Sequence, residues 1–163
     1  MANVNSPNGF TPAYHMSGGT IRPSEFAIAS GTNASIFSGD VVNLSSGLVI
    51  QGTATGVPLG VFGGVEYQAT DGSVVFSKVW TADVATLGAA NAKAYVYSDP
   101  DIVYEAQSTG TPTQASIGTT NTISTTAGDS NTGRSKEGVT TTTSSGIATV
   151  VGFPQKPNNS IGQ

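Results

Sequence analysis

Short apolar runs separated by turn residues fill the chain from Glu25 onward, and this pattern limits the fold more than any other feature of the sequence. Gly and the β-branched Thr are both abundant and both lower helix propensity, so a helical bundle is excluded. The pattern predicts an all-β fold, namely a small antiparallel β-barrel or sandwich. Strands are expected at residues 26–29, 41–44, 48–51, 59–68, 74–80, 94–97, 102–107 and 147–153.

Residues 59–68 are apolar at both odd and even positions and are interrupted by Gly60, Gly63 and Gly64. Apolar residues on both parities, together with glycines, are typical of a strand that bends sharply at a barrel corner. We therefore expect a central strand at this position.

Turn residues predict two hairpins. Asp71-Gly72 lies between strand-like runs and favours a type I′ turn, in which both central residues have positive φ. The sequence Ser98-Asp99-Pro100-Asp101 predicts a second hairpin, which joins the runs on either side of it. Residues 82–94, by contrast, are compatible with one or two helical turns that have Asp83 as their N-cap.

The length of 163 residues predicts a single domain. Residues 1–24 contain three prolines and no helical or alternating period, so we expect an extended N-terminal arm. Residues 25–157 are expected to form one β-rich domain, followed by a C-terminal tail at 158–163. Within that domain, residues 108–146 are rich in Thr, Ser and Gly. They are expected to form a long loop, because they carry too little apolar area to offset the entropy lost on ordering.

Charge and cysteine content exclude several classes of function. The net charge of -4 and the sequence pI of about 4.6 oppose binding to nucleic acid. The absence of cysteine excludes thiol catalysis, disulfides and thiolate metal sites. No run approaches the ~18 apolar residues of a membrane span, and no secretion signal is visible. We predict no metal, no cofactor, no nucleic acid and no membrane partner.

The sequence also predicts a protein that is not an enzyme. His15 is the one side chain expected to titrate near neutral pH, and no acidic residue lies near it in the sequence. The ten acidic residues are scattered, so a catalytic carboxylate pair would need tertiary proximity. A hydrolase with an unrecognised site is the least favoured alternative.

Two motifs match ligand-binding patterns only in part. Residues 128–135 have the spacing of a phosphate-binding P-loop, but Arg134 occupies the Lys position and no helix is expected after it. Asp129 and Glu137 suggest a calcium loop, but Gly133 occupies a ligand position and the Glu comes too early. Asp99 and Asp101 are suited to weak chelation. For both acidic groups an ordinary turn is favoured.

Six residues of the expected arm are candidates for contact with a partner: Phe10, Pro12, Tyr14, His15, Met16 and Arg22. Aromatic residues, Met and Arg are enriched in interface cores, and this segment is too irregular to build a core of its own. We expect the arm to face a partner. The alternative is an arm that folds back on its own barrel.

Four segments of the sequence resemble the head cement, or decoration, proteins of tailed bacteriophages, which are small virion proteins. The resemblance covers roughly residues 5–107 and returns at 147–157. The segments are residues 5–19 (NSPNGFTPAYHMSGG), 36–44 (IFSGDVVNL), 59–64 (LGVFGG) and 97–101 (YSDPD).

The resemblance implies a β-rich domain on the outer surface of a capsid, assembled in the host cytoplasm. Its partners would be the major capsid protein and other copies of itself, with trimers favoured. A cement subunit that contacts neighbouring capsid subunits must lose those contacts before DNA pressure can separate them, and many modest contacts then act together. The alternative function is a receptor- or glycan-binding β-module of a tail fibre or surface structure, which would need exposed aromatic side chains on a concave face.

Overall fold

The computed structural model describes residues 5–88, 92–143, 145–156 and 159. As expected, the chain is all-β, its strand ladders are antiparallel, and the helical content of the described residues is a single turn of 3-10 helix at Gln114–Ser116. No helix in this part of the chain is long and apolar enough to cross a membrane.

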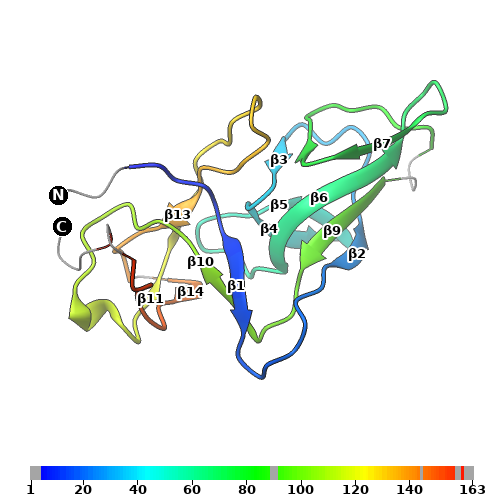
Figure 1. Ribbon diagram of the computed structural model, residues 1–163. Helices are drawn as coiled ribbons and strands as arrows, with labels where there is room; N and C mark the ends of the chain where they lie inside the picture. Colours follow the sequence, from blue (N-terminus) through cyan, green and yellow to red (C-terminus); the bar gives the residue numbers. More distant parts are fainter. Residues whose placement is uncertain (1–4, 89–91, 144, 157–158, 160–163) are drawn as a thin grey trace.

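The largest sheet has six strands, with β9, β6 and β4 at its centre (Figure 1). Its order is β2-β9-β6-β4-β5, and β7 pairs with the far half of β6. A single parallel bridge between Ile28 and Val49 joins the residue after β2 to β5. The sheet is therefore curled until its two edges meet, without a full ladder between them. The strands are β2 (Ser24–Ala27), β4 (Val41–Ser45), β5 (Leu48–Gln51), β6 (Gly60–Gln68), β7 (Val74–Ser77) and β9 (Ala92–Tyr97).

Four two-stranded ladders complete the described fold. In Figure 1 the strands β1, β10, β11, β13 and β14 lie on one side of the curled sheet. The pairs are β1 (Thr11–His15) with β10 (Ile102–Glu105), β3 (Ile36–Phe37) with β8 (Val79–Trp80), β11 (Thr120–Asn121) with β14 (Ala148–Thr149), and β12 (Ile123–Ser124) with β13 (Gly138–Val139).

Successive residues of the central strands are buried in two different cores. In β4, Val42 belongs to the core inside the curled sheet, and Val41 belongs to a second core beneath β1, β10 and β12. In β6, Phe62 likewise lies in the core inside the curled sheet, and Val61 lies in the second core. Because neighbouring side chains of a strand point to opposite faces, two apolar residues in a row can fill both cores. This confirms the expectation that residues 59–68 form a central strand.

The two expected hairpins have different outcomes. β6 and β7 form the first, but Asp71 does not have the positive φ that a type I′ turn needs, and its carboxylate instead accepts a hydrogen bond from the N–H of Ser73. Positive φ at two successive residues occurs instead between β4 and β5, at Ser46 (51°) and Gly47 (79°). The second expected hairpin is wrong, because β10 leaves the sheet that contains β9 and pairs with β1.

Two further expectations need correction. Residues 82–88 form no helix, because Asp83 has a φ of 60° and its N–H donates to the carbonyl of Thr32. Residues 92–94 belong to β9, and 89–91 lie outside the described residues. The strand expected at 147–153 is reduced to Ala148–Thr149.

The segment expected to be a long Thr/Ser/Gly-rich loop contains three short strands, β11, β12 and β13. Their side chains also pair, as in the 2.6 Å hydrogen bond between the hydroxyl groups of Thr122 and Thr140. Ile123 adds a buried apolar side chain to the second core. Backbone ladders, pairs of hydroxyl groups and a few buried apolar side chains therefore give this segment an ordered structure, although its composition predicted a loop.

Candidate functional site around the first strand

β1 folds back on its own chain. It pairs with β10 in the register Thr11 to Glu105 and His15 to Ile102, with a bulge between Pro12 and Tyr14. Sequence periodicity missed this strand because it has only five residues and includes Pro12. Of the two alternatives for the N-terminal arm, the chain has the folded-back one at residues 10–15.

Phe10 anchors the start of β1. Its side chain is 7% exposed and packs in the second core, and its N–H donates to the carbonyl of Gly39 at 2.9 Å. Phe10 is therefore a core residue in this conformation, and its assignment as a partner contact is corrected. The physical reason is that an aromatic ring of this size stabilises more by filling its own core than by remaining in water.

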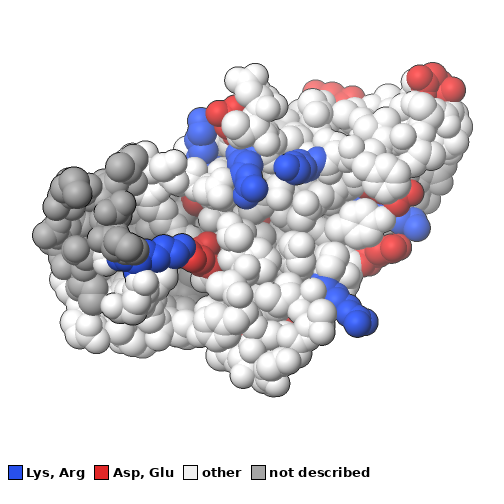
Figure 2. All heavy atoms as spheres, in the orientation of Figure 1, with Lys and Arg blue, Asp and Glu red and all other residues white. Residues whose placement is uncertain are grey.

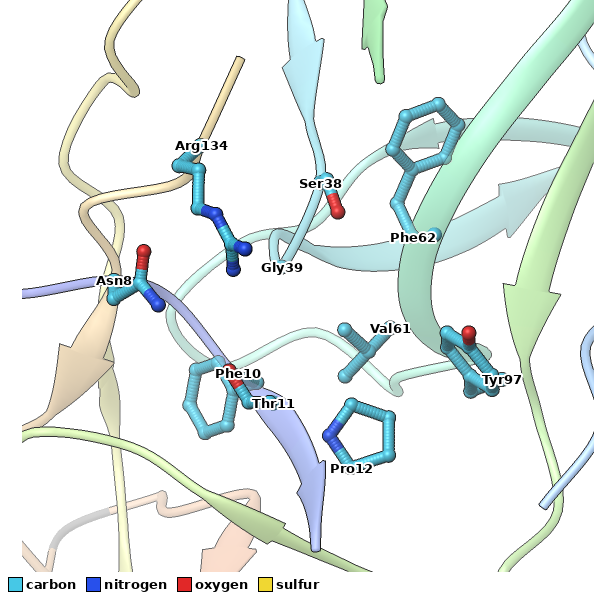
Figure 3. A pocket seen from close by; sticks show the side chains of 11 residues that line it. Asn8, Phe10, Thr11, Pro12, Ser38, Gly39, Val61, Phe62, Tyr97 and Arg134 are labelled. Atoms are coloured by element: carbon cyan, nitrogen blue, oxygen red, sulfur yellow. The ribbon is translucent and has the colours of Figure 1, made fainter. Parts of the chain in front are cut away.

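A hollow of about 110 Å³ lies beside β1 (Figure 3). It has room for a few water molecules or the end of one side chain. The guanidinium group of Arg134 is directed toward its interior, and Arg134 forms no salt bridge with any described residue. The lining residues are Asn8, Phe10, Thr11, Pro12, Ser38, Gly39, Val61, Phe62, Gly63, Tyr97 and Arg134.

The loop that carries Arg134 is not a phosphate cradle. The N–H of Asn131 donates to the Asp129 carboxylate at 2.9 Å, and the N–H of Gly133 donates to the Asp129 carbonyl at 2.8 Å. In a phosphate-binding loop these donors would converge on the ligand. β13 rather than a helix follows the loop. As the sequence indicated, the P-loop spacing occurs without its structure.

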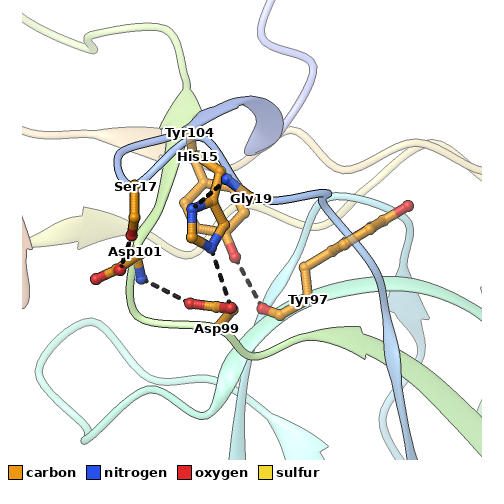
Figure 4. Close-up of polar contacts among 7 residues, drawn as sticks. All are labelled: His15, Ser17, Gly19, Tyr97, Asp99, Asp101 and Tyr104. Carbon is orange, nitrogen blue, oxygen red and sulfur yellow. Dashed lines mark hydrogen bonds and ion pairs between the residues drawn. The ribbon is translucent and has the colours of Figure 1, made fainter.

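The far end of β1 is held by a cluster of polar side chains (Figure 4). His15 Nε2 lies 3.2 Å from Asp99 Oδ2, and the N–H of Gly19 donates to His15 Nδ1 at 3.3 Å. The Ser17 hydroxyl donates to the Asp101 carboxylate. Residues 84 positions apart therefore join two turns into one corner. The sequence did not predict this, because it places no acid near His15.

The same geometry decides what the corner can do chemically. His15, Asp99 and Asp101 lie close enough to hold a metal ion. However, His15 Nδ1 accepts a hydrogen bond from the N–H of Gly19. In the neutral ring the proton therefore lies on Nε2, which donates to Asp99. The backbone N–H of Asp101 and the His15 ring together lower the pKa of Asp99. We interpret the cluster as a hydrogen-bonded corner that positions β1.

The other arm candidates face solvent or line the hollow. Tyr14 is 55% exposed and Met16 is 60% exposed, and Arg22 is exposed in the connection to β2. Pro12 is half-buried in the wall of the hollow. Tyr14 and Met16 therefore present apolar surface next to a corner that is firmly hydrogen-bonded.

The surface around these residues carries few charges. Figure 2 shows a largely neutral face, on which three basic groups lie close together in the upper part of the view and the other charged groups are scattered. Three of the basic residues form salt bridges with acids on the surface: Lys93 with Glu25, Lys136 with Asp129, and Lys156 with Glu105. A partner of this face would mainly meet neutral polar and apolar groups.

The sequence did not show that two acids, Asp40 and Glu137, are buried together. Asp40 is 1% exposed and Glu137 is fully buried. Burial raises the pKa of both carboxyl groups. No local pattern marks them, because the hydrogen bond from the Val41 N–H to Glu137 joins residues 96 positions apart.

Comparisons of the chain with known protein families, with curated proteins and with solved structures find no match.

Proposed function

We propose that this protein is a structural protein of a tailed-phage virion that binds the outer surface of the capsid and cements neighbouring major capsid protein subunits. The observation that supports the proposal is the position in the fold of the four sequence segments that resemble cement proteins. Ten of the eleven residues that line the hollow beside β1 belong to these segments, and only Arg134 does not. Segments that are far apart in the sequence therefore build one surface.

The role is mechanical rather than enzymatic, and β1 is suited to it. Its ladder with β10 is extended at the start by the bond from the Phe10 N–H to Gly39 and at the end by the bond from the Met16 N–H to Asp101. A load on the strand would act on these bonds together with the buried Phe10 ring. Contacts made through β1 would therefore be carried by the body of the protein.

The partner surface proposed here consists of Tyr14, Met16, Arg22, Pro12 and Arg134. Exposed aromatic, Met and Arg side chains contribute strongly to interfaces. The guanidinium of Arg134, which forms no salt bridge with a described residue, suits an acidic side chain of the partner, which would enter the hollow. Further copies of the protein, arranged as trimers on the head, would multiply these contacts.

Point substitutions test this surface better than removal of residues 1–24, which would also remove β1 and the buried Phe10. We expect the wild-type protein to cosediment with expanded heads from which this protein has been stripped. Replacement of Tyr14 and Met16 together by Ser should weaken binding by about tenfold or more, because each lost interface anchor typically costs 1 kcal/mol or more. Arg134→Gln should weaken binding and reduce its dependence on salt.

The matched control is the double replacement of Val74 and Phe76 by Ser. Phe76 is 71% exposed, and Val74 is exposed on the same strand, β7, away from β1 in Figure 1. This variant should bind heads as the wild type does. The proposal is wrong if the folded wild-type protein does not bind heads. The choice of surface is wrong if the two double variants lose binding equally.

One observation favours the alternative of a glycan-binding module. Phe76 and Tyr95 line a groove together with Ser77 and Lys78, and aromatic rings beside polar groups suit a sugar ring. A glycan array would test this directly. Binding that Phe76→Ala abolishes, without binding to heads, would support the glycan-binding function in place of the capsid role.

A further inference from the structure

Two carboxyl groups are buried together outside the surface proposed for the capsid. One oxygen of Asp40 accepts a hydrogen bond from the N–H of Phe37 at 2.8 Å, and one oxygen of Glu137 accepts from the N–H of Val41 at 2.8 Å. The second oxygens, Asp40 Oδ1 and Glu137 Oε1, each expose less than 1 Å² and accept no hydrogen bond from any described residue. Buried polar atoms are normally satisfied, so this pair requires an explanation.

The pair lies where two parts of the fold meet. Asp40 belongs to the connection between β3 and β4, and Glu137 directly precedes β13. Ser135 lies next to both acids, because its side chain lowers the pKa of Asp40, which burial raises, and its hydroxyl accepts from the N–H of Glu137 at 3.0 Å. The pair therefore connects the Thr/Ser-rich segment to the curled sheet.

No positive charge balances the two acids. Neither forms a salt bridge with a described residue, Arg134 is exposed at the rim of the neighbouring hollow, and Lys136 pairs with Asp129. The N-terminal segment contributes Gly9 and Phe10, and the second core contributes apolar side chains. Two ionised carboxylates in such surroundings would be strongly unfavourable.

A proton fits the site better than a metal ion. A hard cation takes six or more oxygen ligands, whereas the pair has two free oxygens that are closed to water. Within the described residues, the one group of three or more ligands with suitable spacing is the corner at His15, Asp99 and Asp101. One proton, in contrast, removes one of two negative charges that lie close enough for Asp40 to raise the pKa of Glu137, and it turns one carboxyl group into a donor while the other remains an acceptor.

We propose that Asp40 and Glu137 share one proton, and that this proton makes the pair a pH-sensitive latch between the Thr/Ser-rich segment and the curled sheet. When the proton is lost, two buried negative charges repel each other, and the segment around Glu137 loosens from β4. The inference does not depend on the proposed capsid role.

The direction of the pH dependence follows from the pKa values. Burial, with a further contribution from the charge of Asp40, raises the pKa of Glu137 from 4.5 to about 8. A group whose pKa is higher in the folded state stabilises the fold fully below its unfolded pKa, and this stabilisation is lost as the pH rises through its folded pKa. The protein is therefore expected to lose stability between about pH 4.5 and pH 8.

The test compares wild-type protein with Glu137→Gln on both sides of the pH at which folded Glu137 is expected to lose its proton. The amide keeps an acceptor for the Val41 N–H and a donor for Asp40, and it does not titrate. We expect the Tm of the wild type to fall by at least about 5 °C between about pH 6 and pH 9.5, and that of the variant by less than half as much. Glu105→Gln is the control, because Glu105 lies on the surface and pairs with Lys156. Its pH profile should follow the wild type.

A second measurement does not require the variant to fold. The carboxyl carbon of Glu137, followed by NMR in the wild type, should titrate near pH 8, and hydrogen-exchange protection at Val41 and Val139 should fall over the same range. Titration near the ordinary glutamate value, or equal pH profiles for wild type and Glu137→Gln, would overturn the latch. A rise in Tm with millimolar Ca²⁺ or Mg²⁺ that Glu137→Gln abolishes would overturn it in favour of a cation site.

Discussion

Gly9 and Gly31 have nearly the same backbone conformation but very different surroundings. Their φ angles are 69° and 70°, in the left-handed region that favours glycine. A Cβ at position 9 would lie 2.5 Å from the Cβ of Ser135 and 2.8 Å from the carbonyl oxygen of Gly39, whereas nothing lies within 4 Å of a Cβ at position 31. Gly9 therefore allows the N-terminal segment to approach the residues beside the buried acids.

Alanine at these two positions separates backbone strain from steric overlap. We expect Gly31→Ala to cost about 1 kcal/mol of unfolding free energy, which is the cost of the left-handed conformation alone. Gly9→Ala should cost about 2–4 kcal/mol, because overlap with packed neighbours adds to the same strain. Urea denaturation measures both. Equal losses for the two variants would show that the close approach at Gly9 has no energetic importance.

The pairing of β1 with β10 makes the N-terminal segment part of the folded body. Local sequence did not predict this element, because five residues that include Pro12 show no useful period. The apolar runs of β4 and β6, in contrast, were visible in the sequence, because successive residues such as Val41 and Val42, or Val61 and Phe62, are buried in one core or the other. An element is thus predictable from its own residues only where burial imposes a pattern on them.

Phe10→Ala tests whether β1 is part of the body. Loss of a buried aromatic ring should lower the unfolding free energy by about 3–5 kcal/mol. Phe76→Ala on β7 is the matched control and should change it by less than about 0.5 kcal/mol, because that ring is exposed. Thermal and urea unfolding give both values. A small effect at Phe10 would mean that β1 does not contribute to stability.

The two cores share β4 and β6, so the whole chain is expected to unfold in one step. Trp80 is fully buried in the core of the curled sheet and is the single Trp of the sequence, so its fluorescence reports on that core. Val61 lies in the second core. Any change there that lowers the midpoint seen by Trp80 must be transmitted through the shared strands.

Val61→Ala is therefore expected to lower the unfolding free energy by about 1–3 kcal/mol, with the same midpoint by Trp fluorescence and by circular dichroism. Val57→Ala is the control, since Val57 is exposed and its loss should leave the midpoint unchanged. A shift seen by circular dichroism but not by Trp80 would mean that the two cores unfold separately.

The all-β class, the approximate positions of the strands in the curled sheet and the hairpin between β6 and β7 could all be predicted from the amino-acid sequence. Apolar runs and turn residues are local properties, so neighbouring residues are enough to reveal them. Tertiary structure alone decided the pairing of β1 with β10, the corner between His15 and Asp99, and the burial of Asp40 beside Glu137. Each of these depends on residues brought together from 84 or more positions apart, where no local pattern connects them.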